Sequence, residues 1–176
     1  MFTYDENNRG LDPVKAGVYE VYANAYSLLT SQSGNEMVQF NYYIREDVDQ
    51  PSKGSEIRYD NFVDTENSKW RWNALTHAIG GIPNGTQMTT QQWAEMVLGK
   101  PIKVKVELVP NSKGKEYPEV KAFYTTDVPN YSIAPKAAKP VKTQSKGFDS
   151  FGGMNQSSTA QADPFASVFD DNLPFK

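Results

Sequence analysis

The sequence contains no cysteine and only one histidine, His77, and these two shortages exclude several kinds of site. Without cysteine the chain can form no disulfide, no thiolate nucleophile and no cysteine-bound zinc site. One histidine is too few for a His-rich metal site. The acidic cluster Glu46, Asp47 and Asp49 precedes a Gly- and Pro-containing loop, which is typical of a solvated turn. We therefore expect no metal and no cofactor.

The sequence also lacks a long apolar run and an excess of positive charge. No segment approaches the roughly 20 apolar residues that a membrane helix needs. The first residues, MFTYDENNRG, lack the basic and apolar regions of a signal peptide, so we expect a soluble, cytoplasmic protein. Lys and Arg number 18 against 21 Asp and Glu, a formal net charge of −3. Total charge alone therefore does not indicate nucleic-acid binding.

No pattern in the chain is typical of an active site. His77 is the sole candidate imidazole base, and it lies in the middle of a predicted helix beside Ala74 and Ala78. The glycine-containing stretch AIGGIPNG lacks a Lys-Ser/Thr ending and follows a helix rather than a strand, so it is not a phosphate-binding loop. We expect the protein not to be an enzyme.

The composition of the chain changes near residue 128. Residues 129–176 are dominated by Pro, Ala, Ser, Gly, Lys and Gln and show no sustained apolar period. Such a segment cannot bury enough apolar surface to offset its conformational entropy. We therefore predict a folded domain over residues 1–128 and a flexible tail over residues 129–176, which is basic at first and ends in an acidic and aromatic tip.

Residues 1–128 carry the periodic patterns of a mostly β domain. Alternating apolar and polar residues predict strands within residues 17–29, 37–46, 54–64, 102–108 and 117–128. Two helical patterns, within residues 67–83 and 89–101, lie between the third and fourth strands. Five strands with helices at that position are the pattern of an OB-fold, a barrel whose face binds oligonucleotides or oligosaccharides. A different five-stranded barrel or a sandwich stays open.

Aromatic and basic residues on the predicted outer sides of these strands form a candidate nucleic-acid-binding set. Single strands are held by such a mixture, because cations follow the phosphates and rings stack on bases at roughly 1–3 kcal/mol each. β-Propensity alone also scatters tyrosines over strands, and the domain is acidic in total, so the hypothesis requires local segregation of charge. The set comprises Tyr22, Tyr26, Tyr43, Arg45, Arg58, Lys103, Lys105, Lys121 and Phe123.

The end of the chain, DDNLPFK, resembles the C-terminal peptide of bacterial single-stranded DNA-binding proteins. Residues 10–128 resemble the single-stranded DNA-binding proteins of phages that infect Gram-positive bacteria, through PVKAGVYEVYANAY, SGNEMVQFNYYI, YDNFV, KWRWNALTHAIG and WAEMVLGKPIKVKVE. The resemblance implies an OB-fold, often oligomeric, that coats single strands in phage replication or recombination. It also implies that the tip recruits replication or recombination proteins. The matching tip residues are Asp170, Asp171, Leu173, Pro174 and Phe175, and Lys176 departs from the pattern.

Two other functions stay open. The barrel could be an adaptor whose main ligand is a protein, with DNA contact secondary, and the acidic total charge of the domain favours this alternative. A carbohydrate-binding OB-fold would also use exposed Tyr and Trp. It has no use for an acidic aromatic tip, so we rank it last.

Overall fold

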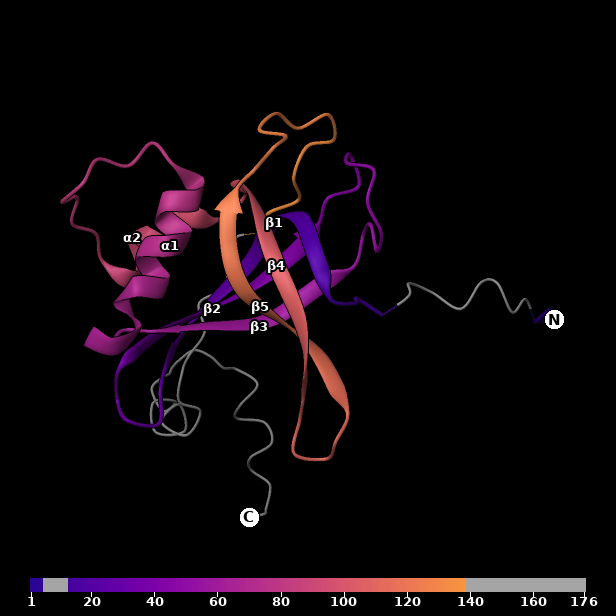
Figure 1. Cartoon of the computed structure of the whole chain (residues 1–176), viewed down its shortest axis with the longest axis horizontal. Coiled ribbons are helices and arrows are strands. Elements are labelled where there is room, and N and C mark those ends of the chain that lie inside the picture. Colours follow the sequence, from indigo (N-terminus) through magenta and orange to yellow (C-terminus); the bar gives the residue numbers. More distant parts are fainter. Residues whose placement is uncertain (5–12, 139–176) are drawn as a thin grey trace, which may run out of the picture. The chain divides into compact units, whose positions relative to one another are not determined.

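The computed structural model describes residues 1–4 and 13–138, which contain five strands and two short α-helices (Figure 1). The strands are β1 (Gly17–Thr30), β2 (Glu36–Ile44), β3 (Glu56–Val63), β4 (Pro101–Pro110) and β5 (Glu116–Thr125). A 3-10 turn, η1 (Glu66–Ser68), and the helices α1 (Lys69–Ile79) and α2 (Thr90–Val97) lie between β3 and β4. The predicted order of elements is confirmed.

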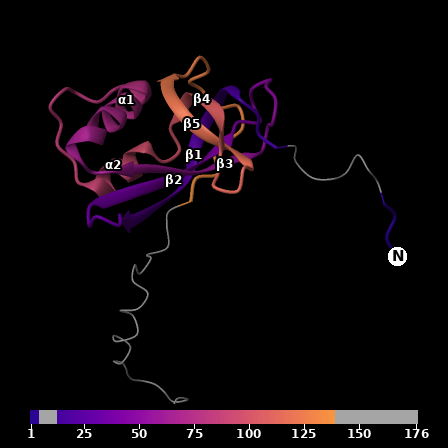
Figure 2. The same ribbon diagram turned by 60° about the horizontal axis from the view of Figure 1, so that its bottom comes forward.

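β1 bends the sheet, because its two halves pair with different neighbours. Residues 17–22 pair with β4 and residues 21–30 pair with β2, both antiparallel. The sheet therefore curls, with the strand order β3-β2-β1-β4-β5 (Figure 2). The predicted mostly β, OB-fold-like barrel is confirmed. The barrel is open, since its edge strands β3 and β5 form no ladder within the described residues.

Arg71 of α1 joins the two edges of the open barrel. Its guanidinium donates to the carboxylate of Asp60 on β3 at 2.7 Å and to the backbone oxygen of Val120 on β5 at 2.9 Å. The same group lies over two rings, 4.5 Å from the centroid of Phe62 and 5.0 Å from that of Phe123. Asp60 is buried, and its pairing with a charged donor offsets the cost of removing the carboxylate from water.

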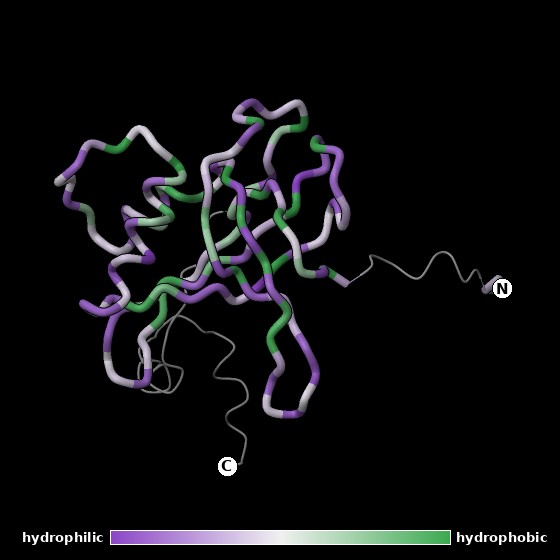
Figure 3. The backbone as a smooth tube through the Cα atoms, in the orientation of Figure 1, coloured by the Kyte–Doolittle hydropathy of each residue, from purple (hydrophilic) through white to green (hydrophobic). Residues whose placement is uncertain are grey.

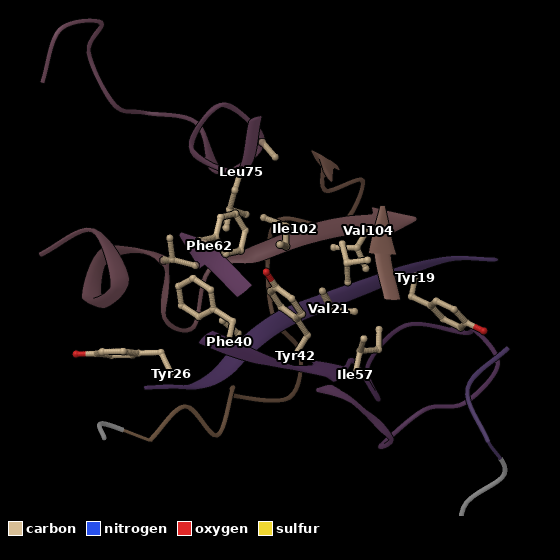
Figure 4. Close-up of a cluster of buried hydrophobic side chains, with 14 of the residues drawn as sticks. Tyr19, Val21, Tyr26, Phe40, Tyr42, Ile57, Phe62, Leu75, Ile102 and Val104 are labelled. Atoms are coloured by element: carbon tan, nitrogen blue, oxygen red, sulfur yellow. The ribbon is translucent and has the colours of Figure 1, made fainter. Parts of the chain in front are cut away.

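One side of each strand faces a single hydrophobic core. The alternation of apolar and polar residues along the strands is visible in Figure 3. Phe40 and Tyr42 of β2 are fully buried and belong to one cluster with Ile102 and Val104 of β4 (Figure 4). Both helices contribute to the same cluster, through Leu75, Ala78, Trp93, Ala94 and Val97.

The chain continues to pack on the barrel after β5. Residues 128–138, here named the strap, form hydrogen bonds with residues of β1, with the segment after β2 and with Gly99. The hydroxyl of Tyr131 donates to the carbonyl of Gly99 at 2.7 Å, and the backbone N–H of Ala138 donates to the carbonyl of Asn24 at 2.9 Å. The folded unit thus extends past the boundary predicted at residue 128. The rest of the predicted tail, residues 139–176 with the tip, lies outside the described residues.

Candidate nucleic-acid interface

Tyr26, predicted to face outward, lies in the core. A β-bulge between Ala23 and Ala25 shifts the alternation of β1, and Tyr26 is only 4% exposed. The shift turns its ring toward Phe40, with the two ring centroids 6.2 Å apart. The outward assignment was wrong because a bulge adds one residue to the strand and moves every later side chain to the other face.

Phe123 is a second residue that the structure removes from the outer surface. It lies opposite Val104 of β4 and packs against the core, with its ring centroid 5.7 Å from that of Phe62. A register shift in β5 beside Lys121 precedes it. The ring of Phe123 is partly buried beside Arg71, so its predicted outward position was wrong.

Arg45 is buried and anchors the strap. Its Nε and Nη2 donate to the two oxygens of Asp47 at 2.9 and 2.8 Å, which is a bidentate pair. Nη1 and Nη2 donate to the backbone oxygens of Val128 and Asn130 at 2.6 and 3.1 Å. The guanidinium also lies 4.5 Å from the ring centroid of Tyr131. At 1% exposure Arg45 does not reach the surface, so its predicted outward position was wrong.

Tyr22 faces outward from β1, as predicted, but the strap covers it. The hydroxyl of Tyr22 accepts a hydrogen bond from the backbone N–H of Lys136 at 2.9 Å. The ring of Tyr131 meets it edge-on, with centroids 5.7 Å apart. Tyr22 is consequently 3% exposed, although its ring also contacts that of Tyr43 at 5.5 Å. The strap therefore occupies the surface of Tyr22 that a base would need.

The three predicted lysines of β4 and β5 are each paired with a carboxylate. The shortest nitrogen-to-oxygen distances are 2.6 Å from Lys103 to Asp127, 3.3 Å from Lys105 to Glu107 and 2.5 Å from Lys121 to Glu119. Exposed pairs of this kind contribute little stability and are screened by salt, so a phosphate can compete for them. They nevertheless leave this side of the barrel without the local excess of positive charge that the hypothesis requires.

A groove of about 750 Å³ brings together two of the predicted residues, Tyr43 and Arg58. Its lining residues come from the segment before β1, the end of β2, the start of β3 and the hairpin of β4 and β5. Lys15 adds a second cation, and Leu108 and Pro118 of the hairpin add an apolar side.

Tyr43 and Arg58, the two predicted residues of the groove, each lie beside a carboxylate. Burial, followed by the nearby carboxylate of Glu46, raises the pKa of the Tyr43 hydroxyl, so this ring stays neutral at physiological pH. The Nε of Arg58 donates to Glu56 at 2.8 Å, and Glu56 accepts a further hydrogen bond from Asn24 at 2.7 Å. The side chain of Arg58 remains 59% exposed, so its guanidinium is oriented and still reaches solvent.

Tyr59 is a candidate that the sequence pattern did not reveal. It follows Arg58 in β3, and strict alternation would place the two on opposite faces. A register shift between β2 and β3 falls at this point, and Tyr59 is 65% exposed with a φ of 66°. A left-handed conformation is costly for a tyrosine, and such strain gathers at binding sites. Its backbone N–H donates to the side chain of Asn41 at 3.1 Å, which fixes the turn.

A second groove, of about 1070 Å³, lies beside α1 and the loop that leads to α2. The exposed His77 lines it, together with Trp72 and Trp93. Both indole N–H groups already donate within the protein, at 3.1 Å to the carbonyl of Val63 and at 2.8 Å to the hydroxyl of Thr76. This groove therefore presents no unpaired buried group within the described part of the chain.

In ranges 1–4 and 13–138, no three His, Asp or Glu side chains gather as a metal site would require. No helix there is long and apolar enough to cross a membrane.

The comparisons with known proteins place the chain in one family. A family described as "Protein of unknown function (DUF669)" matches residues 2–140. This match spans the whole folded unit described above, including the strap. No curated protein has a significantly similar sequence.

Proposed function

We propose that this chain, which belongs to the DUF669 family of proteins of unknown function, binds single-stranded DNA without sequence preference. The observation that carries the proposal is the groove in which Tyr43, Arg58 and Lys15 lie together on an OB-fold-like sheet. A neutral ring beside two cations is the combination that holds a base and its phosphate. Barrels of this type bind oligonucleotides on their strand face.

In this proposal, the bound DNA continues from the groove along the outer side of β2 and β3. Tyr59 offers an exposed ring there, and Gln39 and Asn61 are bonded to each other across the two strands at 2.8 Å. Rings and amides on this side suit any base, because every base has a stacking face and polar edges. The strap covers the outer side of β1, so the DNA would follow the outer side of β2 and β3.

The proposed biological role combines the resemblance to phage single-stranded DNA-binding proteins with the groove and the outer side of β2 and β3. The protein protects single strands during phage DNA replication or recombination, in the cytoplasm of the infected bacterium, and it has no enzymatic activity. Its C-terminal tip recruits replication or recombination proteins. The protein requires no cofactor for these tasks, since stacking and ion pairing supply the binding energy.

One observation favours the adaptor function as a second candidate. Lys103, Lys105 and Lys121 are all paired with carboxylates, so the β4 and β5 side has the mixed charge of a protein-binding surface rather than the positive charge of a DNA-coating one. An adaptor would bind oligonucleotides weakly and with little dependence on their length.

Fluorescence titration with oligo-dT of increasing length separates the two functions. We expect affinity to rise with length, and Tyr59→Ala to weaken binding by about 1–3 kcal/mol, the contribution of one stacked base. Trp70→Ala is the matched control, because Trp70 is similarly exposed, at 63%, but lies on α1, outside both the groove and the proposed path along β2 and β3. Micromolar, length-independent binding that is equal in both variants would contradict DNA binding and favour the adaptor.

A further inference from the structure

Ser55 lines the groove and carries a buried hydroxyl that has no hydrogen-bond partner among the described residues. The residue is 6% exposed. Its backbone is fixed by hydrogen bonds, from its own N–H to the carbonyl of Ser52 at 3.0 Å and from the N–H of Ile44 to its carbonyl at 2.9 Å. Buried polar groups in native proteins are nearly always paired, so this hydroxyl indicates a ligand that supplies the partner.

The other unpaired buried side-chain atom in the described residues belongs to a residue that is hydrogen-bonded to Glu56, the chain neighbour of Ser55. It is the side-chain oxygen of Asn24, whose amide nitrogen donates to Glu56 at 2.7 Å. Ser55 precedes Glu56 in the chain, and Glu56 in turn holds the Nε of Arg58. Both unpaired oxygens therefore belong to residues beside the carboxylate that orients the exposed cation of the groove.

The remaining walls of the groove suit a flat, partly apolar group attached to an anion. The ring of Tyr43 contacts the ring of Tyr22, with the two centroids 5.5 Å apart, and this contact restrains the position of Tyr43. Leu108 of the hairpin adds apolar surface. The cations Lys15 and Arg58 share the groove with the carboxylates of Glu56 and Glu116, so a phosphate has to compete for Arg58. A nucleotide combines these properties, since its base has apolar faces and a polar edge and its phosphate is negative.

We propose that the groove is a subsite for one nucleotide of the bound strand, an inference that rests on the proposed function. The base lies against Tyr43, a polar group on its edge bonds to the hydroxyl of Ser55, and its phosphate contacts Arg58 and Lys15. Ser55 is thus a recognition residue, and the unpaired state of its hydroxyl in the free protein is the sign of that role.

Ser55→Ala tests the role of the hydroxyl with two readouts. Binding of a dT 20-mer should weaken about three- to tenfold, the effect of losing one hydrogen bond. The melting temperature of the free protein should stay equal or rise, because the substitution removes an unpaired buried group. Ser33→Ala is the control, since Ser33 is exposed in the turn between β1 and β2, and this variant should bind like the wild type. Wild-type affinity of Ser55→Ala would overturn the subsite.

Photocrosslinking of the full-length wild-type protein supplies a measurement that needs no variant. A dT 20-mer in which 5-iododeoxyuridine replaces some thymidines should crosslink to the peptide that contains Tyr43. Crosslinks confined to other peptides, with binding intact, would overturn the subsite and leave DNA binding standing. If the wild-type protein neither binds nor crosslinks to the oligonucleotide, both proposals fail.

Discussion

The role of a charged or aromatic residue in this protein is decided by the groups that surround it. Arg45 and Arg58 both follow alternating strand patterns, yet Arg45 is buried against the strap and Arg58 is exposed in the groove. Arg45 meets its backbone acceptors only because Val128 and Asn130 return to the barrel. A buried guanidinium must keep its partners, because losing one leaves an uncompensated charge, whereas an exposed guanidinium is available to a ligand.

The pair formed by Arg45 and Asp47 should give the protein a measurable acid sensitivity. The hydrogen bond from Arg45, with help from the backbone N–H of Ser132, lowers the pKa of Asp47 to about 2 despite the opposing effect of burial. The folded pKa lies below the unfolded value of about 3.9, so the carboxylate stabilises the fold above about pH 4 and loses this effect as the pH falls toward 2.

The free energy of unfolding in urea, measured between about pH 6 and pH 2, checks this expectation. The wild type should be more stable than Asp47→Asn at the upper end of the range, and the difference should shrink as the pH falls. A difference that stays constant over the whole range would show that Asp47 is not the group responsible.

Among the elements, the strap links the folded core to the candidate interface. Tyr131 of the strap packs on Tyr22, and Tyr22 packs on Tyr43 in the groove. These three rings form a continuous row from the strap to Tyr43, the ring of the proposed nucleotide subsite. The strap thus contacts, through Tyr22, the ring of Tyr43 that the proposed subsite uses.

Two truncated chains measure the contribution of the strap. The chain ending at residue 127 loses the acceptors of Arg45, and the chain ending at residue 138 keeps them. Asp47 still pairs with Arg45 in the shorter chain, but the guanidinium loses two hydrogen bonds and the ring of Tyr131. Hydrogen bonds to a charged group contribute about 1.5–3 kcal/mol each, so the shorter chain should melt roughly 10 °C lower than the longer one. Equal melting temperatures for the two chains would show that the strap adds nothing to the folded unit.

At the scale of the whole molecule, the sides of the barrel have different roles. The strap covers the outer side of β1, and paired charges cover β4 and β5. The outer side of β2 and β3 and the adjoining groove remain for a ligand. Because the chain has a net charge of −3, the proposed binding of an anionic strand depends on the local charge of Lys15 and Arg58.

The acidic end of the chain should then compete with DNA. Deleting residues 163–176 removes Asp163, Asp170 and Asp171, and we expect tighter oligo-dT binding at low salt and a flatter salt dependence. A full-length variant with these three residues changed to Asn is the matched control, and it should behave like the deletion if charge is the cause. Unchanged affinity in both proteins would exclude competition by the tip.

Local patterns in the sequence were sufficient for the elements and the architecture. The alternation in residues 37–46 predicted β2, and the helical spacing before Gly80 predicted α1. The position of the helices between the third and fourth strands indicated the OB-fold-like order. These features depend on residues close together in the chain, whose periods of 2.0 and 3.6 can be read directly.

The sequence by itself determined the strands, the helices, the apolar positions of most of the core and two residues of the groove, Tyr43 and Arg58. Only the tertiary structure decided that Tyr26 turns inward at a bulge, that Arg45 is enclosed and that Ser55 is left with an unpaired hydroxyl. The physical reason is that a pattern gives the period of a strand, whereas bulges and partners depend on contacts between distant segments, such as Arg45 and Val128, which are 83 positions apart.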